Sequence, residues 1–306
     1  MENSIISPLT GSSNVANIGS FPVSDILQKW KEQLKIDITS EFNSTGISTF
    51  NLYRCNDSQL LFFKPSLEGS PYIYQELQDN FNWYYVEEKW EYDVAIGEIR
   101  GAKNCLEVGS GSGAFIKKAL AAGINVIGTE TSADAVQKAH AANLPVHLLS
   151  FDQAIEKLGA KPDVVLAFQV LEHIADPLPF IQGMVDMLEV GGKLIICVPN
   201  ADSFYKYDNN VLDMPPHHQT RWSLATFKAF EQLFPLKLQT VDYEPLSHWH
   251  VPSWVNAVGS HFRANKWYGK LIFNRQSTRV INRLLRTRIR SLIRGHSIYV
   301  SFEKTQ

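Results

Sequence analysis

A glycine-rich run at residues 109–113 is the part of the sequence best suited to hold a ligand. Gly109, Gly111 and Gly113 follow an apolar run at 105–108 and precede a helical pattern at 114–122. Glycines tolerate positive φ and let a ligand approach bare backbone, and the start of a helix offers unpaired N–H groups. A plain strand-to-helix turn is the alternative. We interpret the run as a ligand cradle at the carboxyl end of a strand.

An acidic residue, Glu130, ends the next strand-like run, roughly 20 residues downstream. A carboxylate there can accept both ribose hydroxyls of an adenosine ligand. The same arrangement serves NAD and S-adenosylmethionine, and Gly109, Gly111 and Ala114 also fit the looser G-x-G-x-x-A dinucleotide pattern. These residues therefore predict an adenosine ligand without choosing between the two.

Two further carboxylates favour S-adenosylmethionine. Glu107 lies two residues before the first glycine, where it would support a cationic amino-acid end and repel a pyrophosphate. Asp152 follows the third strand-like run, and we expect it to accept from the adenine amino group. The alternative for Asp152 is an ordinary cap of the helix expected at 153–158.

These residues need a parallel sheet to bring them together, and the chain predicts one. Short apolar runs at 105–109, 125–130, 145–150, 163–169 and 193–199 alternate with helical patterns at 114–122, 133–142, 153–158 and 177–188. Such alternation is typical of an α/β fold, a doubly wound Rossmann-like sheet covered on both faces. Two more strands are expected at 236–244 and 297–303, after a helix near 223–232, with a mostly helical insertion at about 250–295 between them.

The first hundred residues predict a smaller unit in front of this sheet. Residues 1–23 are rich in Ser, Asn and Gly, which favours a flexible arm. Residues 24–100 are expected to form an N-terminal cap, with a helix at 24–35, a hairpin at 50–64 and helices over 71–100. The ligand-binding domain is expected to span 101–306.

Over roughly residues 100–200 the sequence resembles the class I S-adenosylmethionine-dependent methyltransferases. LEVGSGSG, the TE at the end of the second strand, FD, FQVLEHIADP and LEVGGKLIICVPN stand in the order and spacing of that family. The resemblance implies a seven-stranded sheet whose last strand, 297–303, is antiparallel. It also implies S-adenosyl-L-methionine as cofactor and S-adenosyl-L-homocysteine as product.

The resemblance further implies which residues contact the cofactor. The glycine run and Glu107 would hold the methionine part, Glu130 the ribose and Asp152 the adenine, while residues 169–171 would line the methionine end, partly through backbone carbonyls. A helix near 85–90 would cap the cofactor, with Lys89 reaching its carboxylate; packing with a solvated lysine is the alternative. The implied contacts are Glu107, Gly109, Ser110, Gly111, Gly113, Glu130, Thr131, Phe151, Asp152, Gln169, Val170, Leu171, Tyr85, Lys89 and Trp90.

Two other segments resemble parts of related enzymes. Residues 215–223 resemble a P-P-H-H-x-x-x-W-S segment of a bacterial subgroup, some members of which are associated with sugar or cell-surface glycan pathways. The hairpin at 50–64 resembles a C-x-x-C hairpin that binds zinc in related enzymes, but Ser58 stands in place of the second cysteine. A lone Cys55 cannot make such a site, so we predict a structural hairpin and no metal.

Three histidines are the candidates for acid–base chemistry. Methyl transfer from a sulfonium is an in-line displacement in which the protein mainly orients the reactants, but a hydroxyl or ammonium acceptor needs a base. His173 follows the fourth strand, where the methyl group should point, and His217 and His218 follow the fifth. We predict these three as catalytic residues; shaping the pocket or fastening a lid is the alternative. His248 and His250 are weaker candidates for lining the acceptor pocket.

Composition limits the remaining possibilities. A net charge of −2 argues against a dedicated nucleic-acid binder, and no apolar run reaches the roughly 18–20 residues that span a bilayer. The N-terminus lacks a signal-peptide pattern, and Cys55, Cys105 and Cys197 stand far apart, so we expect a cytoplasmic protein with reduced thiols. The expected partner is a small-molecule acceptor, with no nucleic acid and no stable membrane insertion; the sequence does not indicate the oligomeric state.

The segment 263–294 has ten Lys or Arg residues and no acidic residue. Apolar residues recur in it at helical spacing: Ile281, Leu284, Leu285, Ile289, Leu292 and Ile293. A solvated basic face over a packed apolar stripe is the plain interpretation, and a phosphate-bearing acceptor or an anionic membrane surface are functional alternatives.

The predicted function is S-adenosylmethionine-dependent methyl transfer to a small molecule, with a sugar or nucleotide sugar as one acceptor class. An NAD(P)-dependent oxidoreductase and a non-catalytic nucleoside-binding module are the competing interpretations. The intact glycine run and Glu130 speak against the second of these.

Overall fold

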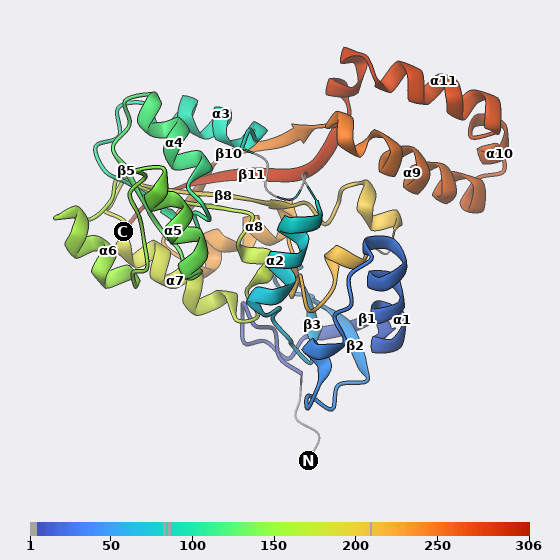
Figure 1. Cartoon of the computed structure of the whole chain (residues 1–306), viewed down its shortest axis with the longest axis horizontal. Helices are drawn as coiled ribbons and strands as arrows, with labels where there is room; N and C mark the ends of the chain where they lie inside the picture. The colour runs from blue at the N-terminus through green and yellow to red at the C-terminus, as the bar shows by residue number, and fades with distance from the viewer. Residues whose placement is uncertain (1–4, 82–83, 85–86, 209) are drawn as a thin grey trace.

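A seven-stranded sheet forms the centre of the molecule in the computed structural model, which describes residues 5–81, 84, 87–208 and 210–306 (Figure 1). The spatial order of its strands is β10-β11-β8-β7-β4-β5-β6. Their bounds are β4 Cys105–Val108, β5 Val126–Thr129, β6 Val146–His147, β7 Val164–Phe168, β8 Lys193–Pro199, β10 Leu236–Pro245 and β11 Arg294–Lys304.

The pairing of these strands is parallel from β6 to β8, and β11 runs antiparallel to both β8 and β10. The predicted mostly parallel sheet with an antiparallel last strand is therefore confirmed. The strand order reverses between β4 and β7, so their carboxyl ends flank the crevice where ligands of such sheets bind.

Helices cover both faces of the sheet (Figure 1). One face packs on α3 Trp90–Glu98, α4 Ala114–Ala121 and α5 Ala133–Ala141, and the other on α6 Phe151–Leu158, α7 Pro177–Met187 and α8 Leu224–Leu233. Neighbouring residues of β7 alternate between the two cores: Val165 packs toward α7 and Leu166 toward α4. Burial on both faces explains why β7 is continuously apolar in the sequence.

A second, four-stranded sheet contains β1 Val15–Pro22, β2 Thr49–Cys55, β3 Leu61–Lys64 and β9 Thr220–Arg221 in that order. The expected hairpin at 50–64 is confirmed as β2 and β3. The flexible arm expected at 1–23 is wrong for 15–22, because β1 pairs antiparallel with β2 and Leu9 is fully buried. Backbone pairing there outweighs the polar composition.

Helices complete the N-terminal part. These are α1 Val23–Lys29, the π-helical η1 Trp30–Leu34, the short η2 Thr39–Phe42 and α2 Pro71–Asn80. The helical pattern expected over 71–100 is interrupted, since α2 ends at Asn80 and α3 begins only at Trp90. Short 3₁₀ turns follow β7 and β8: η3 Leu171–His173, η4 Phe204–Tyr207 and η5 Val211–Asp213.

The helical insertion between β10 and β11 projects away from the sheet, with α10 at its far end (Figure 1). It consists of η6 His248–His250, α9 Val251–Asn265, α10 Gly269–Ile272, α11 Arg275–Leu285 and η7 Arg288–Leu292. A small core of its own joins α9 to η4 and to Phe273 and Leu285. Among the described residues, no helix combines the length and apolar character needed to cross a membrane.

Candidate functional site

The glycine run forms a tight turn between β4 and α4. Gly109, Gly111 and Gly113 have φ values of 70°, 53° and 86°, which only glycine adopts readily. The N–H groups of Gly109 and Ser110 both donate to the carbonyl of Thr129, at 2.9 and 3.0 Å, so the turn is tied to the end of β5. A Cβ at Gly109 would lie 2.6 Å from Val170 Cγ2, which shows how closely the turn approaches the segment after β7.

Glu130 secures the same turn through its carboxylate. Its Oε2 accepts from the N–H of Gly111 at 2.8 Å, and its Oε1 accepts from the N–H groups of Thr131 and Ser132 at 2.7 and 2.9 Å. A carboxylate has about four lone-pair sites, so capacity remains for ribose hydroxyls. The structure thus brings Glu130 and Thr131 to the glycine turn, as the sequence predicts.

Glu107 supplies the observation that tests whether an amino-acid ligand fits. Its side chain is buried, and its Oε2 has no hydrogen-bond partner among the described residues. Burial raises the pKa of Glu107 well above its usual value, while the charge of Lys89 lowers it and that of Glu130 raises it. A buried acceptor beside a glycine turn fits the cationic ammonium of a methionine moiety. Lys89 lies near enough for its charge to act on Glu107.

The adenine side is less complete. Ser150 caps α6 in a capping box with Gln153, so the alternative role of Asp152 as a helix cap is wrong. The side chain of Asp152 is exposed and lies in the first turn of α6. Phe151 packs its ring on Phe180 of α7 at a centroid distance of 5.8 Å. The adenine contacts of both residues remain predictions.

Residues 169–171 carry the chain from β7 toward the histidines. Gln169 adopts a positive φ of 56°, and its Nε2 donates to Glu91 Oε1 at 3.2 Å. The carbonyl of Leu171 accepts from Thr220 Oγ1 at 2.9 Å, and that of Val170 from the N–H of His173 at 3.0 Å. Both carbonyls therefore hold the turn in shape.

Of the cap residues near 85–90, Tyr85 lies outside the described residues. Lys89 precedes α3 as its N-cap residue rather than lying within a helix. Trp90 is half-buried and packs on Tyr299 of β11 at 6.3 Å between ring centroids. This packing matches the plainer alternative for Trp90.

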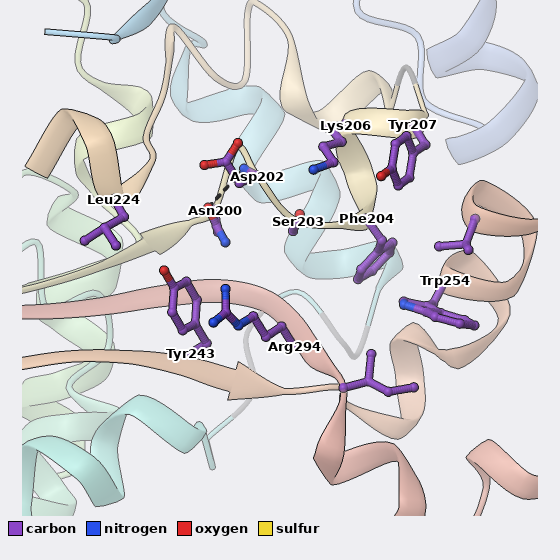
Figure 2. A pocket seen from close by; sticks show the side chains of 12 residues that line it. Asn200, Asp202, Ser203, Phe204, Lys206, Tyr207, Leu224, Tyr243, Trp254 and Arg294 are labelled. Carbon is purple, nitrogen blue, oxygen red and sulfur yellow. Dashed lines mark hydrogen bonds between the residues drawn. The ribbon is translucent and has the colours of Figure 1, made fainter. Parts of the chain in front are cut away.

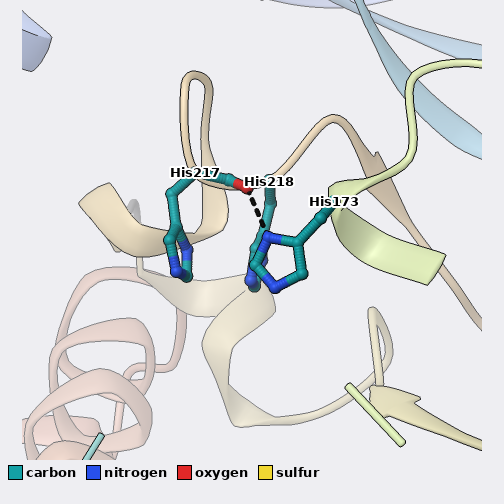
Figure 3. A group of neighbouring side chains, drawn as sticks. All are labelled: His173, His217 and His218. Carbon is teal, nitrogen blue, oxygen red and sulfur yellow. Dashed lines mark hydrogen bonds between the residues drawn. The ribbon is translucent and has the colours of Figure 1, made fainter. Parts of the chain in front are cut away.

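The three predicted catalytic histidines meet in one cluster (Figure 3). Each ring has its Nδ1 bound to an acceptor: His173 to the carbonyl of His217 at 2.7 Å, His217 to the carbonyl of Leu212 at 2.7 Å, and His218 to Asp213 Oδ1 at 3.2 Å. An Nδ1–H that donates in this way leaves Nε2 as the nitrogen with a lone pair. The Nε2 of His217 already lies 2.7 Å from the hydroxyl of Tyr84.

Burial keeps these histidines neutral. It lowers the pKa of His173 to about 4, and lowers the pKa values of His217 and His218 well below the usual value. Three neutral imidazoles with ligand atoms within 4.8 Å of one another could hold a divalent cation. No carboxylate belongs to this set of three, and Tyr84 occupies one nitrogen, so the absence of a metal remains our prediction.

A cavity of about 340 Å³ opens beyond the carboxyl end of β8. It includes neither the glycine turn nor the histidine cluster. Figure 2 shows Asn200 and Arg294 pointing toward one another across it, with aromatic side chains on its walls. The guanidinium of Arg294 lies 4.2 Å from the ring centroid of Tyr243. Its polar and aromatic lining residues are Asn200, Asp202, Ser203, Phe204, Lys206, Tyr207, Tyr243, Trp254 and Arg294, and its aliphatic ones are Leu224, Val258 and Ile293.

His296 lies between this cavity and the histidine cluster. Its ring packs on Tyr205 at 4.7 Å, its carbonyl accepts from the N–H of Asn200 at 2.8 Å, and its charge would act on His218. Sequence reasoning missed His296, and also missed Tyr74 and Tyr84, which contact the cluster from α2 and from the segment after it. No local pattern marks these residues, because only the tertiary fold brings them to β7. His248 and His250 do not line the cavity.

A family model described as a methyltransferase domain matches residues 83–268, more than half of the chain. The chain belongs to this methyltransferase family. Together with the sheet order and the glycine turn, membership makes it a class I S-adenosylmethionine-dependent methyltransferase by family, as the sequence predicts, rather than a nicotinamide-dependent oxidoreductase.

Individual relatives are more distant. A tRNA U34 carboxymethyltransferase from Shewanella halifaxensis is 27% identical over 198 residues, covering 61% of this methyltransferase and 57% of that protein. A ubiquinone biosynthesis O-methyltransferase from Ralstonia nicotianae is 27% identical over 163 residues, which cover 47% of this chain and 68% of that protein. A crystal structure of a SAM-dependent methyltransferase from Archaeoglobus fulgidus aligns with a TM-score of 0.45 at 18% identity, and the alignment covers 77% of this chain and 100% of that one. The chain spans less than two thirds of the first relative, and the two names point to different acceptors.

Proposed function

We propose that this protein transfers the methyl group of S-adenosylmethionine to a hydroxyl of a small polar molecule of the sugar or nucleotide-sugar class. The observation that carries the cofactor half is the buried Glu107 Oε2, which has no hydrogen-bond partner in the described part of the chain and lies beside the glycine turn that Glu130 secures. When bound, the cofactor supplies a methyl group already activated on a sulfonium. The side chains then have to bind, orient and exclude water.

We place the body of the acceptor in the cavity beyond β8 and its reacting hydroxyl outside that cavity, at His173. Ring faces of Tyr207, Tyr243 and Trp254 suit the apolar face of a sugar, and Asn200 and Asp202 suit its hydroxyls. The cationic groups of Lys206 and Arg294 suit a phosphate. A volume of about 340 Å³ suits a sugar unit of such an acceptor.

His173 is the residue we assign to the reacting hydroxyl. Its Nδ1–H donates to the carbonyl of His217, so its Nε2 can accept a hydrogen bond from the acceptor hydroxyl. With a pKa of about 4, the neutral ring holds the hydroxyl in line and takes its proton only once methyl transfer has made that oxygen strongly acidic. His217 orients His173 through its backbone carbonyl, and the rings of His217 and His218 pack against the ring of His173.

The test is label transfer from methyl-labelled S-adenosylmethionine in parallel reactions with a set of nucleotide sugars, bulk tRNA and a catechol. We expect label in a nucleotide-sugar fraction, and an increase in KM of about tenfold or more for Arg294→Gln, because a charge-assisted hydrogen bond is lost. Arg288→Gln, on the exposed insertion, is the matched control. Label found in tRNA or the catechol alone would reject the sugar class while retaining the cofactor half.

A further inference from the structure

The helical insertion (residues 248–292) exposes two kinds of side chain, basic and apolar. It contains nine of the ten Lys or Arg residues of 263–294, a segment without a single acidic residue, and the tenth is Arg294 of β11. None of these ten forms an ion pair within the part of the chain that the structure describes. A concentration of uncompensated positive charge on a chain with a net charge of −2 indicates an anionic partner.

Large apolar side chains of the insertion also lie open to solvent. Trp267 is 88% exposed, Leu292 86% and Leu271 69%. Val280, Leu284 and Ile289 are exposed as well. The sequence-based expectation that Leu284, Ile289 and Leu292 belong to a packed stripe is therefore wrong, since only Ile281, Leu285 and Ile293 pack into the core of the insertion. Large exposed apolar side chains on one projection mark an interaction site.

On α11 the basic and the exposed apolar side chains lie next to one another. At about 100° per residue, Arg275, Arg279, Arg283 and Arg286 fall within an arc of roughly 80°. Val280 and Leu284 lie beside that arc, between the arginines and the buried side that packs on α9. Arginines flanking an exposed apolar strip, with a tryptophan nearby, are typical of helices that lie in the headgroup region of a bilayer.

We infer that the helical insertion docks this protein on an anionic phospholipid surface, with Trp267, Leu271 and Leu292 entering the interface and the arginines meeting lipid phosphates. RNA would satisfy the charges but leave these apolar side chains in water. A second copy of the chain would bring two strongly basic insertions together. The inference goes beyond the proposed function and does not depend on it.

The test is co-sedimentation of the full chain with vesicles of phosphatidylcholine, with or without about one third phosphatidylserine. We expect binding only to the anionic vesicles. The triple change Arg279→Gln, Arg283→Gln and Arg286→Gln should weaken it about 100-fold, at about fivefold for each charge. Trp267→Ser with Leu292→Ser should weaken it about tenfold or more.

Matched controls lie on the body of the protein. Val190→Ser, 66% exposed, and Lys237→Gln should leave binding unchanged, and unaltered S-adenosylhomocysteine affinity verifies folding of every variant. Leu292→Ser alone serves if the double variant misfolds. The inference is overturned by equal binding to neutral and anionic vesicles or by binding to neither. RNA binding that only the arginine variant loses would identify RNA as the partner in place of lipid. A dimer that Trp267→Ser dissociates would identify a second copy of the chain as the partner.

Discussion

The N–H of Gly111 donates to Glu130 Oε2 at 2.8 Å, which couples the turn after β4 to the end of β5. The same carboxylate accepts from the N–H groups of Thr131 and Ser132, so one side chain joins the glycine turn to the segment that follows β5. The residue predicted to hold the ribose therefore also fixes the turn predicted to hold the methionine end. Its loss should affect binding of the whole cofactor.

Glu130→Ala should weaken binding of S-adenosylhomocysteine by about 10- to 100-fold, because charge-assisted hydrogen bonds to backbone and ribose are lost together. Isothermal titration of the variant and the parent protein measures the change. Glu156→Ala, an exposed acid on α6, is the control and should bind normally. An unchanged dissociation constant for Glu130→Ala would mean that Glu130 does not contribute to cofactor binding.

Gly109→Ala should lower the free energy of unfolding by about 1–2 kcal/mol or more, since its φ of 70° is unfavourable for alanine and its Cβ would press on Val170. Chemical denaturation measures this loss, and S-adenosylhomocysteine affinity should fall as well. Gly97→Ala is the counterpart, because Gly97 lies in helix α3 with open space around it. That change should be neutral or stabilising by about 0.5–1 kcal/mol. Equal effects of the two substitutions would contradict a strained turn.

His173→Ala should lower kcat by about 10²- to 10⁴-fold while leaving S-adenosylhomocysteine affinity unchanged. The reason is that we propose Nε2 of His173 to orient the acceptor hydroxyl and the glycine turn to hold the cofactor. Steady-state rates with the acceptor identified by label transfer provide the measurement, and His248→Ala, exposed on η6, is the control. Normal turnover by the His173→Ala variant would mean that the imidazole only shapes the pocket and does not take part in catalysis.

His296 should make the protein less stable as the pH falls. Burial lowers its folded-state pKa to about 3, whereas the unfolded chain binds a proton below about pH 6.5. Below that pH the unfolded state binds more protons, so stability is lost at about 1.4 kcal/mol per pH unit. Between pH 7 and pH 5, the parent protein should lose about 2 kcal/mol more than His296→Gln, measured by urea denaturation. Identical losses would mean that His296 is not kept neutral by the fold.

The parallel sheet could be predicted because its strands are buried on both faces, so β7 is wholly apolar and β4 and β8 are apolar apart from Glu107 and Lys193. The glycine turn was predictable because positive φ selects glycine locally. The tertiary contacts of the histidine cluster could not be predicted in this way. Tyr74 of α2 and His296 of β11 both act on the cluster, although they lie more than a hundred residues apart in the chain. β1 was mistaken for a flexible arm, since its stability comes from pairing with β2 rather than from its own composition.

The most direct test of the account is a paired calorimetric titration of the full chain with S-adenosylhomocysteine and with NADH. The account predicts one S-adenosylhomocysteine per chain, lost or strongly weakened in Glu130→Ala, and no heat from NADH. Binding of NADH without binding of S-adenosylhomocysteine would mean that the turn between β4 and α4, with Glu107 behind it, holds a dinucleotide instead.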